Sequence, residues 1–167
     1  MKDLIEGEIF LKARKWKEAF DFFSNLDLTN ESLEDISYIK CSIAQCYVGM
    51  DNLSEAINLY NDVINSFPIY RRPYFELGLL YEKNRMYSSE ISILERALKT
   101  TKRTSCKERE DSWNKNFFLH LTFALFQTGS YEKAAGYIAI ASLLFPTENF
   151  ENELEMCKNA WKSSLGT

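Results

Sequence analysis

The chain has 167 residues, of which 46% are hydrophobic, 26% charged and 14% aromatic, and this composition excludes an intrinsically disordered chain. The net charge of -4 argues against nucleic acid as the main partner, because domains that bind phosphates usually carry a basic surplus. No segment has the apolar length of a membrane span or the pattern of a signal peptide, so we expect a cytoplasmic protein without membrane insertion.

Helices dominate the pattern along the chain. Only 6 Gly and 3 Pro occur, which favours helices over many short strands. The hydrophobic periodicity predicts helices at roughly 2–12, 15–26, 35–49, 52–66, 71–84, 87–101, 114–128, 131–144 and 148–163. The first eight are expected to form antiparallel pairs. The last carries Phe150, Leu154 and Trp161 among many charges, as expected of a cap.

An internal repeat runs through these helices. Segments that begin at residues 37, 71 and 115 align with one another, and a degenerate copy precedes them. The repeats span approximately 2–26, 37–68, 71–101 and 115–146, followed by the cap helix at 148–163. The first two aligned segments begin 34 residues apart, which is the period of a tetratricopeptide array.

The repeat positions carry a family pattern of large apolar, small and aromatic residues. In the first segment these are Ile43, Ala44, Tyr47, Ala56, Tyr60, Val63 and Pro68; in the second Tyr74, Leu77, Gly78, Tyr81, Leu94 and Ala97; in the third Phe118, Leu121, Leu125, Ala134, Ile138, Ala141 and Pro146. The chain therefore resembles the tetratricopeptide repeat (TPR) family. This resemblance implies an all-α fold, an α-solenoid of antiparallel helix pairs with a C-terminal capping helix, in one domain over 1–167.

Two positions depart from the family pattern. Small residues are expected where the two helices of a pair cross closely. Glu90 stands at such a place in the second segment, and Thr122 replaces the small residue after Leu121 in the third.

The concave face of such an array is lined mainly by places 2, 5, 9 and 12 of each repeat. These places hold Tyr38, Cys41, Gln45 and Val48; Arg72, Phe75, Leu79 and Glu82; and Asn116, Leu119, Phe123 and Phe126. From them we take as candidate partner-binding residues Tyr38, Gln45, Arg72, Phe75, Leu79, Asn116, Phe123 and Phe126. Either these side chains cover one another and the cap helix, or they form a hydrophobic groove for a partner helix. The Lys and Asn residues of the carboxylate clamp in chaperone-binding family members are missing.

About ten extra residues interrupt the period between the second and third aligned segments. They lie in TTKRTSCKEREDSW, which mixes charges of both signs. We predict that residues 102–112 form the most exposed connection of the chain. This segment is either a solvated loop or a recognition loop on a binding face.

The second half of the chain also resembles the repeat region attached to many bacterial and phage family 2 glycosyltransferases. The matching residues are Arg71, Arg72, Pro73, Tyr74, Ala97, Leu98, Asp111, Trp113, Gly129, Tyr131 and Ala134. The proline that usually follows the tryptophan is missing. The chain also has no Asp-x-Asp pair, so this resemblance implies an accessory segment without the catalytic part.

The sequence predicts neither catalysis nor a bound metal or cofactor. The four cysteines form no Cys-x-x-Cys pair, His120 is the only histidine, and phosphate-binding loops and nucleophile elbows are missing. We expect buried thiols rather than a metal or redox site. His120 is expected to be packed or to lie at the edge of the groove rather than to catalyse.

These patterns lead to one main hypothesis and two others. The main hypothesis is a non-catalytic scaffold that binds a protein, peptide or helix through its concave face. The alternative is the accessory TPR segment of a glycosyltransferase system, which would position an acceptor or dimerise and would have the catalytic chain as a partner. The third is a self-assembling homo-oligomer.

Overall fold

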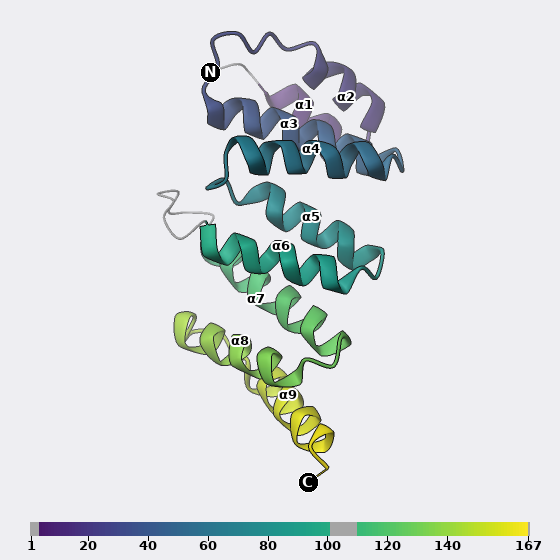
Figure 1. Cartoon of the computed structure of the whole chain (residues 1–167). Coiled ribbons are helices and arrows are strands. Elements are labelled where there is room, and N and C mark those ends of the chain that lie inside the picture. The colour runs from purple at the N-terminus through teal and green to yellow at the C-terminus, as the bar shows by residue number, and fades with distance from the viewer. Residues whose placement is uncertain (1–3, 101–109, 167) are drawn as a thin grey trace. The chain divides into compact units, whose positions relative to one another are not determined.

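The computed structural model describes residues 4–100 and 110–166, and over these residues the chain is helical with no strand. The helices are α1 (Ile5–Lys12), α2 (Trp16–Ser24), α3 (Leu33–Gly49), α4 (Leu53–Ser66), α5 (Arg72–Lys83), α6 (Tyr87–Thr100), α7 (Glu110–Gln127), α8 (Tyr131–Leu144) and α9 (Glu151–Ser164). Figure 1 shows the two helices of a pair reversing direction at a short turn, for example between α3 and α4 and between α7 and α8. The predicted all-α fold is confirmed, and most helix ends lie within two or three residues of their predicted places.

The chain divides into two compact units. The first contains the residues up to Leu77 together with Thr100, and the second contains Gly78–Lys99 together with α7, α8 and α9. The boundary therefore falls inside α5.

Each unit has its own hydrophobic core. In the first, Ala19, Phe23, Ile39 and Cys46 are fully buried among half-buried apolar residues of α1, α2 and α3. In the second, the core cluster is Phe118, Ile138, Ala141 and Phe150, with Leu154 of α9 packed against it. Burial of each large side chain contributes about 1.5–3 kcal/mol. The helix predicted as a cap thus packs against the last pair.

The four turns within the helix pairs share one geometry. In each, a single residue takes a positive φ of 56° to 75°, and these residues are Arg14, Asp51, Arg85 and Gly129. Around Arg14, the Arg14 N–H donates to the Leu11 carbonyl at 3.1 Å and the Lys15 N–H donates to the Phe10 carbonyl at 2.9 Å. The same two bonds recur in the other three turns, and this is the Schellman motif that ends a helix. Only the last turn uses glycine, the residue that adopts this conformation without strain.

The close crossing predicted for the second aligned segment is present. A Cβ atom added to Gly78 of α5 would lie 2.9 Å from Leu94 Cδ2 of α6, so a larger residue does not fit. Glu90 and Thr122, the two departures from the small-residue pattern, are both buried. Buried polar side chains at such places need hydrogen-bond partners, so both residues are candidates for a binding site.

One prediction about the insertion was wrong. Helix α7 begins at Glu110 rather than near residue 114, so residues 110–112 are helical and do not belong to an exposed connection. The rest of the predicted connection, 102–109, lies outside the described residues.

Candidate functional site

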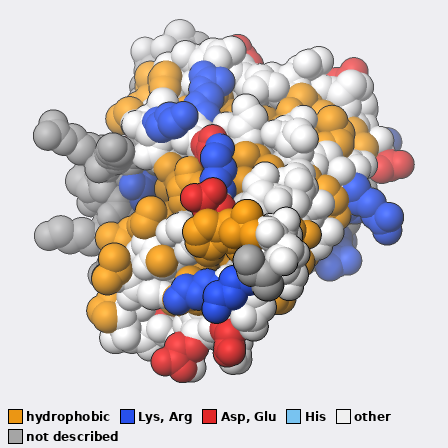
Figure 2. Space-filling view, turned by 60° about the horizontal axis from the view of Figure 1, so that its bottom comes forward, with side chains coloured by type: hydrophobic (Ala, Val, Ile, Leu, Met, Phe, Trp, Pro, Cys, Tyr) orange, Lys and Arg blue, Asp and Glu red, His pale blue; other side chains and the backbone are white. Residues whose placement is uncertain are grey.

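Two of the predicted partner-binding residues expose large apolar surface in the second unit. Leu79 of α5 is 38% exposed and Phe123 of α7 is 41% exposed, although both side chains are fully apolar. The ring of Phe123 lies 6.0 Å from that of Tyr87 in an edge-on contact. Figure 2 shows that hydrophobic side chains reach the surface in small groups with charged side chains between them. Leu79 and Phe123 therefore remain available for contact.

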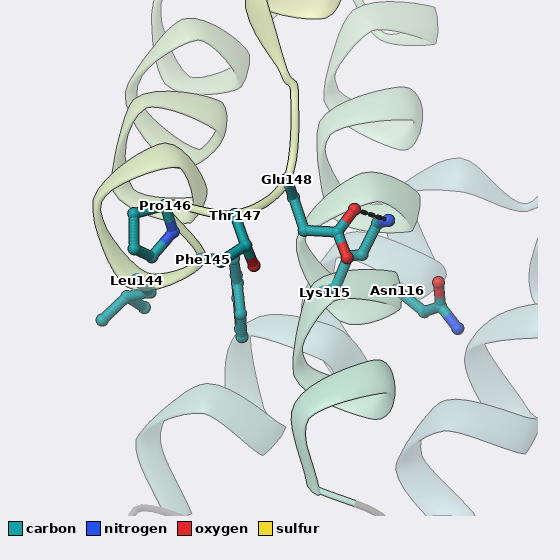
Figure 3. A pocket seen from close by; sticks show the side chains of 7 residues that line it. All are labelled: Lys115, Asn116, Leu144, Phe145, Pro146, Thr147 and Glu148. Carbon is teal, nitrogen blue, oxygen red and sulfur yellow. Dashed lines mark hydrogen bonds and ion pairs between the residues drawn. The ribbon is translucent and has the colours of Figure 1, made fainter.

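The other two candidates in this unit differ from each other. Phe126 is half-buried, and its ring lies 5.1 Å from that of Tyr131. Asn116 is exposed and lines a pocket together with Lys115 and residues 144–148 (Figure 3). Lys115 and Glu148 form an ion pair across this pocket. This pairing neutralises the charges on its wall, so the pocket offers little to hold a charged ligand.

Helix α8 presents an exposed apolar stripe that the sequence reasoning missed. Ile140, Leu143 and Leu144 are 45%, 82% and 58% exposed, and they lie three and four residues apart on one helix face. The opposite face of α8 is buried through Ile138 and Ala141. Helix α8 thus carries apolar residues on both its buried and its exposed face. Apolar residues on every face were the sequence signal for this stripe, but the repeat pattern explains only those on the buried face.

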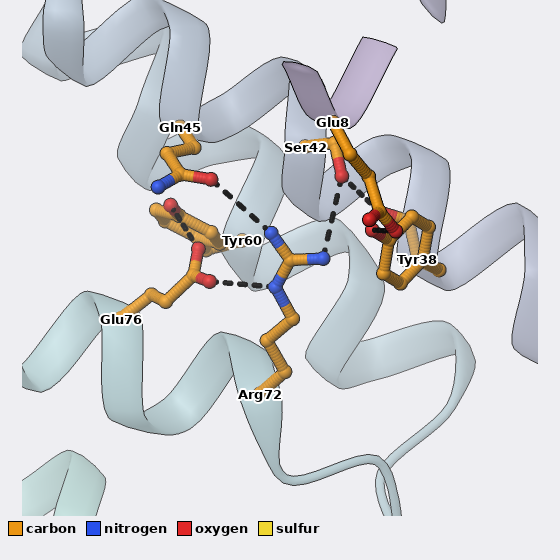
Figure 4. A network of polar contacts seen from close by, with 7 residues as sticks. All are labelled: Glu8, Tyr38, Ser42, Gln45, Tyr60, Arg72 and Glu76. Atoms are coloured by element: carbon orange, nitrogen blue, oxygen red, sulfur yellow. Dashed lines mark hydrogen bonds and ion pairs between the residues drawn. The ribbon is translucent and has the colours of Figure 1, made fainter. Parts of the chain in front are cut away.

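In the first unit, three half-buried candidates belong to one network, in which Arg72 contacts both Tyr38 and Gln45. The Arg72 Nε donates to Glu76 Oε1 at 2.6 Å, and its two terminal nitrogens donate to Ser42 Oγ and Gln45 Oε1, each at 3.3 Å (Figure 4). The guanidinium also lies 4.8 Å from the centroid of the Tyr38 ring. This network joins α3 to α5.

The network continues through two tyrosines. The Tyr38 hydroxyl donates to Glu8 Oε1 at 2.7 Å, and the Tyr60 hydroxyl donates to Glu76 Oε2 at 2.5 Å. Burial and the neighbouring carboxylate raise the pKa of Tyr60. Burial lowers the pKa of Arg72, but Glu76, Cys41 and Tyr70 together raise it by more, so the net shift is upward. Arg72 therefore remains positively charged, and it donates hydrogen bonds to Glu76, Ser42 and Gln45 of the same chain. Phe75, the fourth candidate of this unit, is half-buried.

The cysteines of the described chain offer no activated nucleophile. Cys41, Cys46 and Cys157 are buried free thiols, as predicted. Burial raises the pKa of Cys46 to about 11 and also raises the pKa of Cys41 and of Cys157. A thiol with a raised pKa is mostly protonated at neutral pH and reacts slowly.

A second polar cluster, which the sequence reasoning did not assemble, lies in the second unit. The His120 Nδ1 of α7 lies 2.6 Å from Glu82 Oε2 of α5. Glu90 of α6 joins them, and one ligand atom from each of the three residues lies within 4.8 Å of the others. Glu82 was expected at the groove and His120 at its edge. The contact between them links the first helices of successive pairs.

Glu90 is the unusual member of this cluster. Its side chain is fully buried, and neither carboxylate oxygen has a hydrogen-bond partner. Burial, reinforced by the charge of Glu82, raises the pKa of Glu90 to about 8. A buried carboxylate without a partner is costly, so it is expected to be either protonated or bound to a cation. The sequence signal for this cluster was Glu90 itself, an acidic residue at a position where the repeat pattern predicts a small one.

Comparison with known proteins identifies the fold. No family model matches the chain, and no curated protein matches it. Solved structures of MamA, a TPR-like protein, do match. The structure of MamA AMB-1 has a TM-score of 0.62 and 18% identity, covering 94% of this chain and 85% of that chain. The structure of MamA MSR-1 has a TM-score of 0.59 and 18% identity, covering 95% and 94%.

A third match is MamA residues 41 to the end from Desulfovibrio magneticus RS-1, with a TM-score of 0.62 and 12% identity, covering 96% of this chain and 89% of that chain. At these identities the likeness concerns the fold alone. The predicted TPR-like fold class is thereby confirmed. Among the described residues, no helix is both long and apolar enough to span a membrane.

Proposed function

We propose that the chain is a non-catalytic interaction module that binds a helix of a protein partner on the apolar surface around Leu79 and Phe123. The observation that carries this proposal is the exposure of both side chains on α5 and α7, the first helices of successive pairs. An exposed apolar patch of this kind costs solvation free energy until a partner covers it.

The chemistry of this surface suits an amphipathic helix. Leu79 lies one helical turn before Glu82, and Phe123 lies one turn after His120. The Glu82–His120 contact therefore stands between the two apolar side chains. A partner helix with apolar residues at successive turns and a polar residue between them would match this order.

The glycosyltransferase alternative stays a prediction from the sequence resemblance. The matching structures named above are of MamA, and they do not support a link to a glycosyltransferase. Two of the residues that carry the resemblance, Tyr74 and Ala97, are buried core residues that any TPR pair would use. A catalytic chain encoded beside this one would be the observation in its favour.

The test compares substitutions on three faces. Phe123→Glu places a charge on the proposed surface, and a partner recovered from the source lysate with the wild-type chain should bind it more weakly by at least about 2 kcal/mol, roughly 30-fold. Leu143→Glu places the same charge on the exposed α8 stripe and should leave the affinity unchanged. The affinities are measured by calorimetry with the purified partner.

A third substitution separates binding from folding. Leu121 lies two residues from Phe123 and is fully buried, so Leu121→Glu should unfold the second unit, whereas Phe123→Glu should keep its helical circular dichroism. Loss of fold in Phe123→Glu would make Phe123 a core residue. Loss of binding in Leu143→Glu alone would move the binding surface to α8. A wild-type chain whose mass in sedimentation is twice that of Phe123→Glu would identify a second copy as the occupant.

A further inference from the structure

The strongest unexplained feature of the molecule is the buried carboxylate of Glu90. It is 0% exposed, and both of its oxygens lack hydrogen-bond partners. A repeat pair needs only a small residue at this place, so packing alone does not account for a glutamate there. A buried unpaired charge is retained in proteins when a ligand neutralises it.

We infer that Glu82, Glu90 and His120 form a binding site for one divalent transition-metal ion of the zinc class. Each residue supplies one ligand atom, and the three atoms lie within 4.8 Å of one another. They come from α5, α6 and α7, so the ion would tie together three helices of the second unit.

The distances fit a site that closes around an ion. Bonds of about 2.1 Å to zinc place neighbouring ligand atoms about 3.0–3.4 Å apart. Glu82 and His120 are closer than this, at 2.6 Å, because they contact each other directly. Glu90 has no atom within hydrogen-bond distance of a partner and must therefore approach. The Glu82–His120 contact must widen, and the Glu90 carboxylate must come closer to both residues. These side-chain shifts are about 1 Å, which a flexible glutamate side chain can make.

The charges favour a dication. Two carboxylates and one imidazole carry a charge of -2 when the imidazole is neutral, as a metal ligand must be. A protonated His120 would neutralise only one of the two carboxylates. A divalent ion neutralises both, and it uses the oxygens of Glu90, which accept no hydrogen bond.

The donor set selects the kind of ion. One imidazole nitrogen with two carboxylate oxygens suits zinc and its first-row neighbours, whereas calcium and magnesium prefer oxygen ligands alone. The side chains of Glu82 and His120 are 28% and 29% exposed, so an ion can enter from solvent on that side. Water would complete the coordination there.

The sequence predicts no bound metal, because its cysteines form no Cys-x-x-Cys pair and its one histidine leaves too few nitrogen or sulfur ligands at the usual spacings. Here the ligands are 8 and 30 residues apart along the chain, and only the stacking of α5, α6 and α7 brings them together. Two of its ligands, Glu82 and His120, also lie between Leu79 and Phe123 on the surface proposed for partner binding. Zinc binding is measured on the chain without a partner, so its outcome can be told apart from that of the proposed function.

The test is zinc binding by the full chain after treatment with a chelator. Calorimetric titration with zinc chloride should give one site per chain, and the unfolding temperature should rise with zinc concentration. Glu90→Gln keeps the side-chain shape and should lower the affinity at least about tenfold, as should His120→Gln. Glu132→Gln, on the exposed face of α8, is the matched control and should bind zinc as the wild type does.

Three results would overturn the inference. The first is a wild-type chain that binds no zinc, manganese or cobalt with one-to-one stoichiometry. The second is wild-type affinity in Glu90→Gln, which is expected to fold because it removes a buried charge. The third is zinc that is lost in Cys106→Ser, since that ion would be held by a thiol. Cobalt absorption without thiolate charge-transfer bands would support the inference.

Discussion

The two units hold their buried charges in opposite ways. In the first, the Arg72 guanidinium and the Glu76 carboxylate are nearly buried, and every partner in the network is a side chain of the chain itself. In the second, the Glu82–His120 contact accounts for one carboxylate, while Glu90 beside it has no partner. The first cluster is complete as it stands, and the second requires a proton or a cation.

This difference separates a structural role from a binding role. Arg72 is a predicted partner-binding residue because it occupies a groove position of its repeat and because Arg is a frequent interface anchor. Its contacts show a residue that already satisfies its donors within the first unit. Burial of a charge is thus a sign of function only when the charge lacks its own partners.

The largest expected effect comes from breaking the complete network. Arg72→Met removes the cation and leaves the Glu76 carboxylate with only the Tyr60 hydroxyl. We expect the free energy of unfolding to fall by about 3–5 kcal/mol, because a buried charge loses its counter-ion. Urea unfolding followed by circular dichroism measures this change.

The double variant Arg72→Met/Glu76→Gln is the control for that experiment. It removes both charges but keeps an acceptor for Tyr60, and it should be more stable than Arg72→Met by about 1–2 kcal/mol. A cost below about 1 kcal/mol for Arg72→Met would show that the network contributes little to stability.

A smaller effect is expected from the incomplete cluster, measured in the presence of a chelator. The pKa of Glu90 is raised to about 8 in the folded chain, above its ordinary value of 4.5, so the folded state binds this proton more tightly than the unfolded state. The contribution of the proton to stability is therefore full below about pH 4.5 and is lost as the pH rises through about 8.

The comparison with Glu90→Gln isolates this contribution. Between pH 5 and pH 9 the wild-type chain should lose about 2–4 kcal/mol relative to the variant, which has no proton to release. Urea midpoints at several pH values give the difference. Parallel pH profiles for the two chains would mean that Glu90 is not the buried acid described here.

The smallest effect concerns Thr122, the other buried polar residue that lacks a partner. Thr122 is 4% exposed, and its hydroxyl makes no hydrogen bond with any described residue. Thr122→Val replaces the hydroxyl by a methyl group of similar size and should raise stability by about 0.5–1 kcal/mol. Thr122→Ser keeps the hydroxyl and removes the methyl group, so it should lower stability in the same thermal assay. A destabilising Thr122→Val would indicate a water-mediated partner for the hydroxyl.

Much of the fold was predictable because helix periodicity and turn residues are local signals. The prediction for α8, 131–144, agrees with the observed helix, which follows Gly129 and ends before Pro146. The prediction for α9 began three residues early. In the structure, the Glu151 N–H donates to Asn149 Oδ1 at 2.9 Å, and this turn delays the helix. The charged residues 110–112 were predicted to lie in a connection, because charge alone does not distinguish a connection from a helix.

The sites were less predictable because they depend on partners distant in the sequence. The repeat positions indicated that Leu79 and Phe123 belong to the first-helix face, and both are exposed. The same positions did not show that Arg72 would donate its hydrogen bonds to Ser42 and Glu76 within the chain. Glu90 was recognised as a departure from the pattern, but its two oxygens without partners become visible only when α5, α6 and α7 are packed together.

The repeated turn around Arg14, Asp51, Arg85 and Gly129 has a consequence for how the chain folds. Each turn ends the first helix of its pair through hydrogen bonds between residues at most five apart, so the chain reverses there without waiting for distant segments. Proteins rich in such local contacts fold within microseconds to milliseconds. During synthesis, α1 and α2 can therefore close while later pairs are still being made, and each finished pair offers the next one a surface on which to condense.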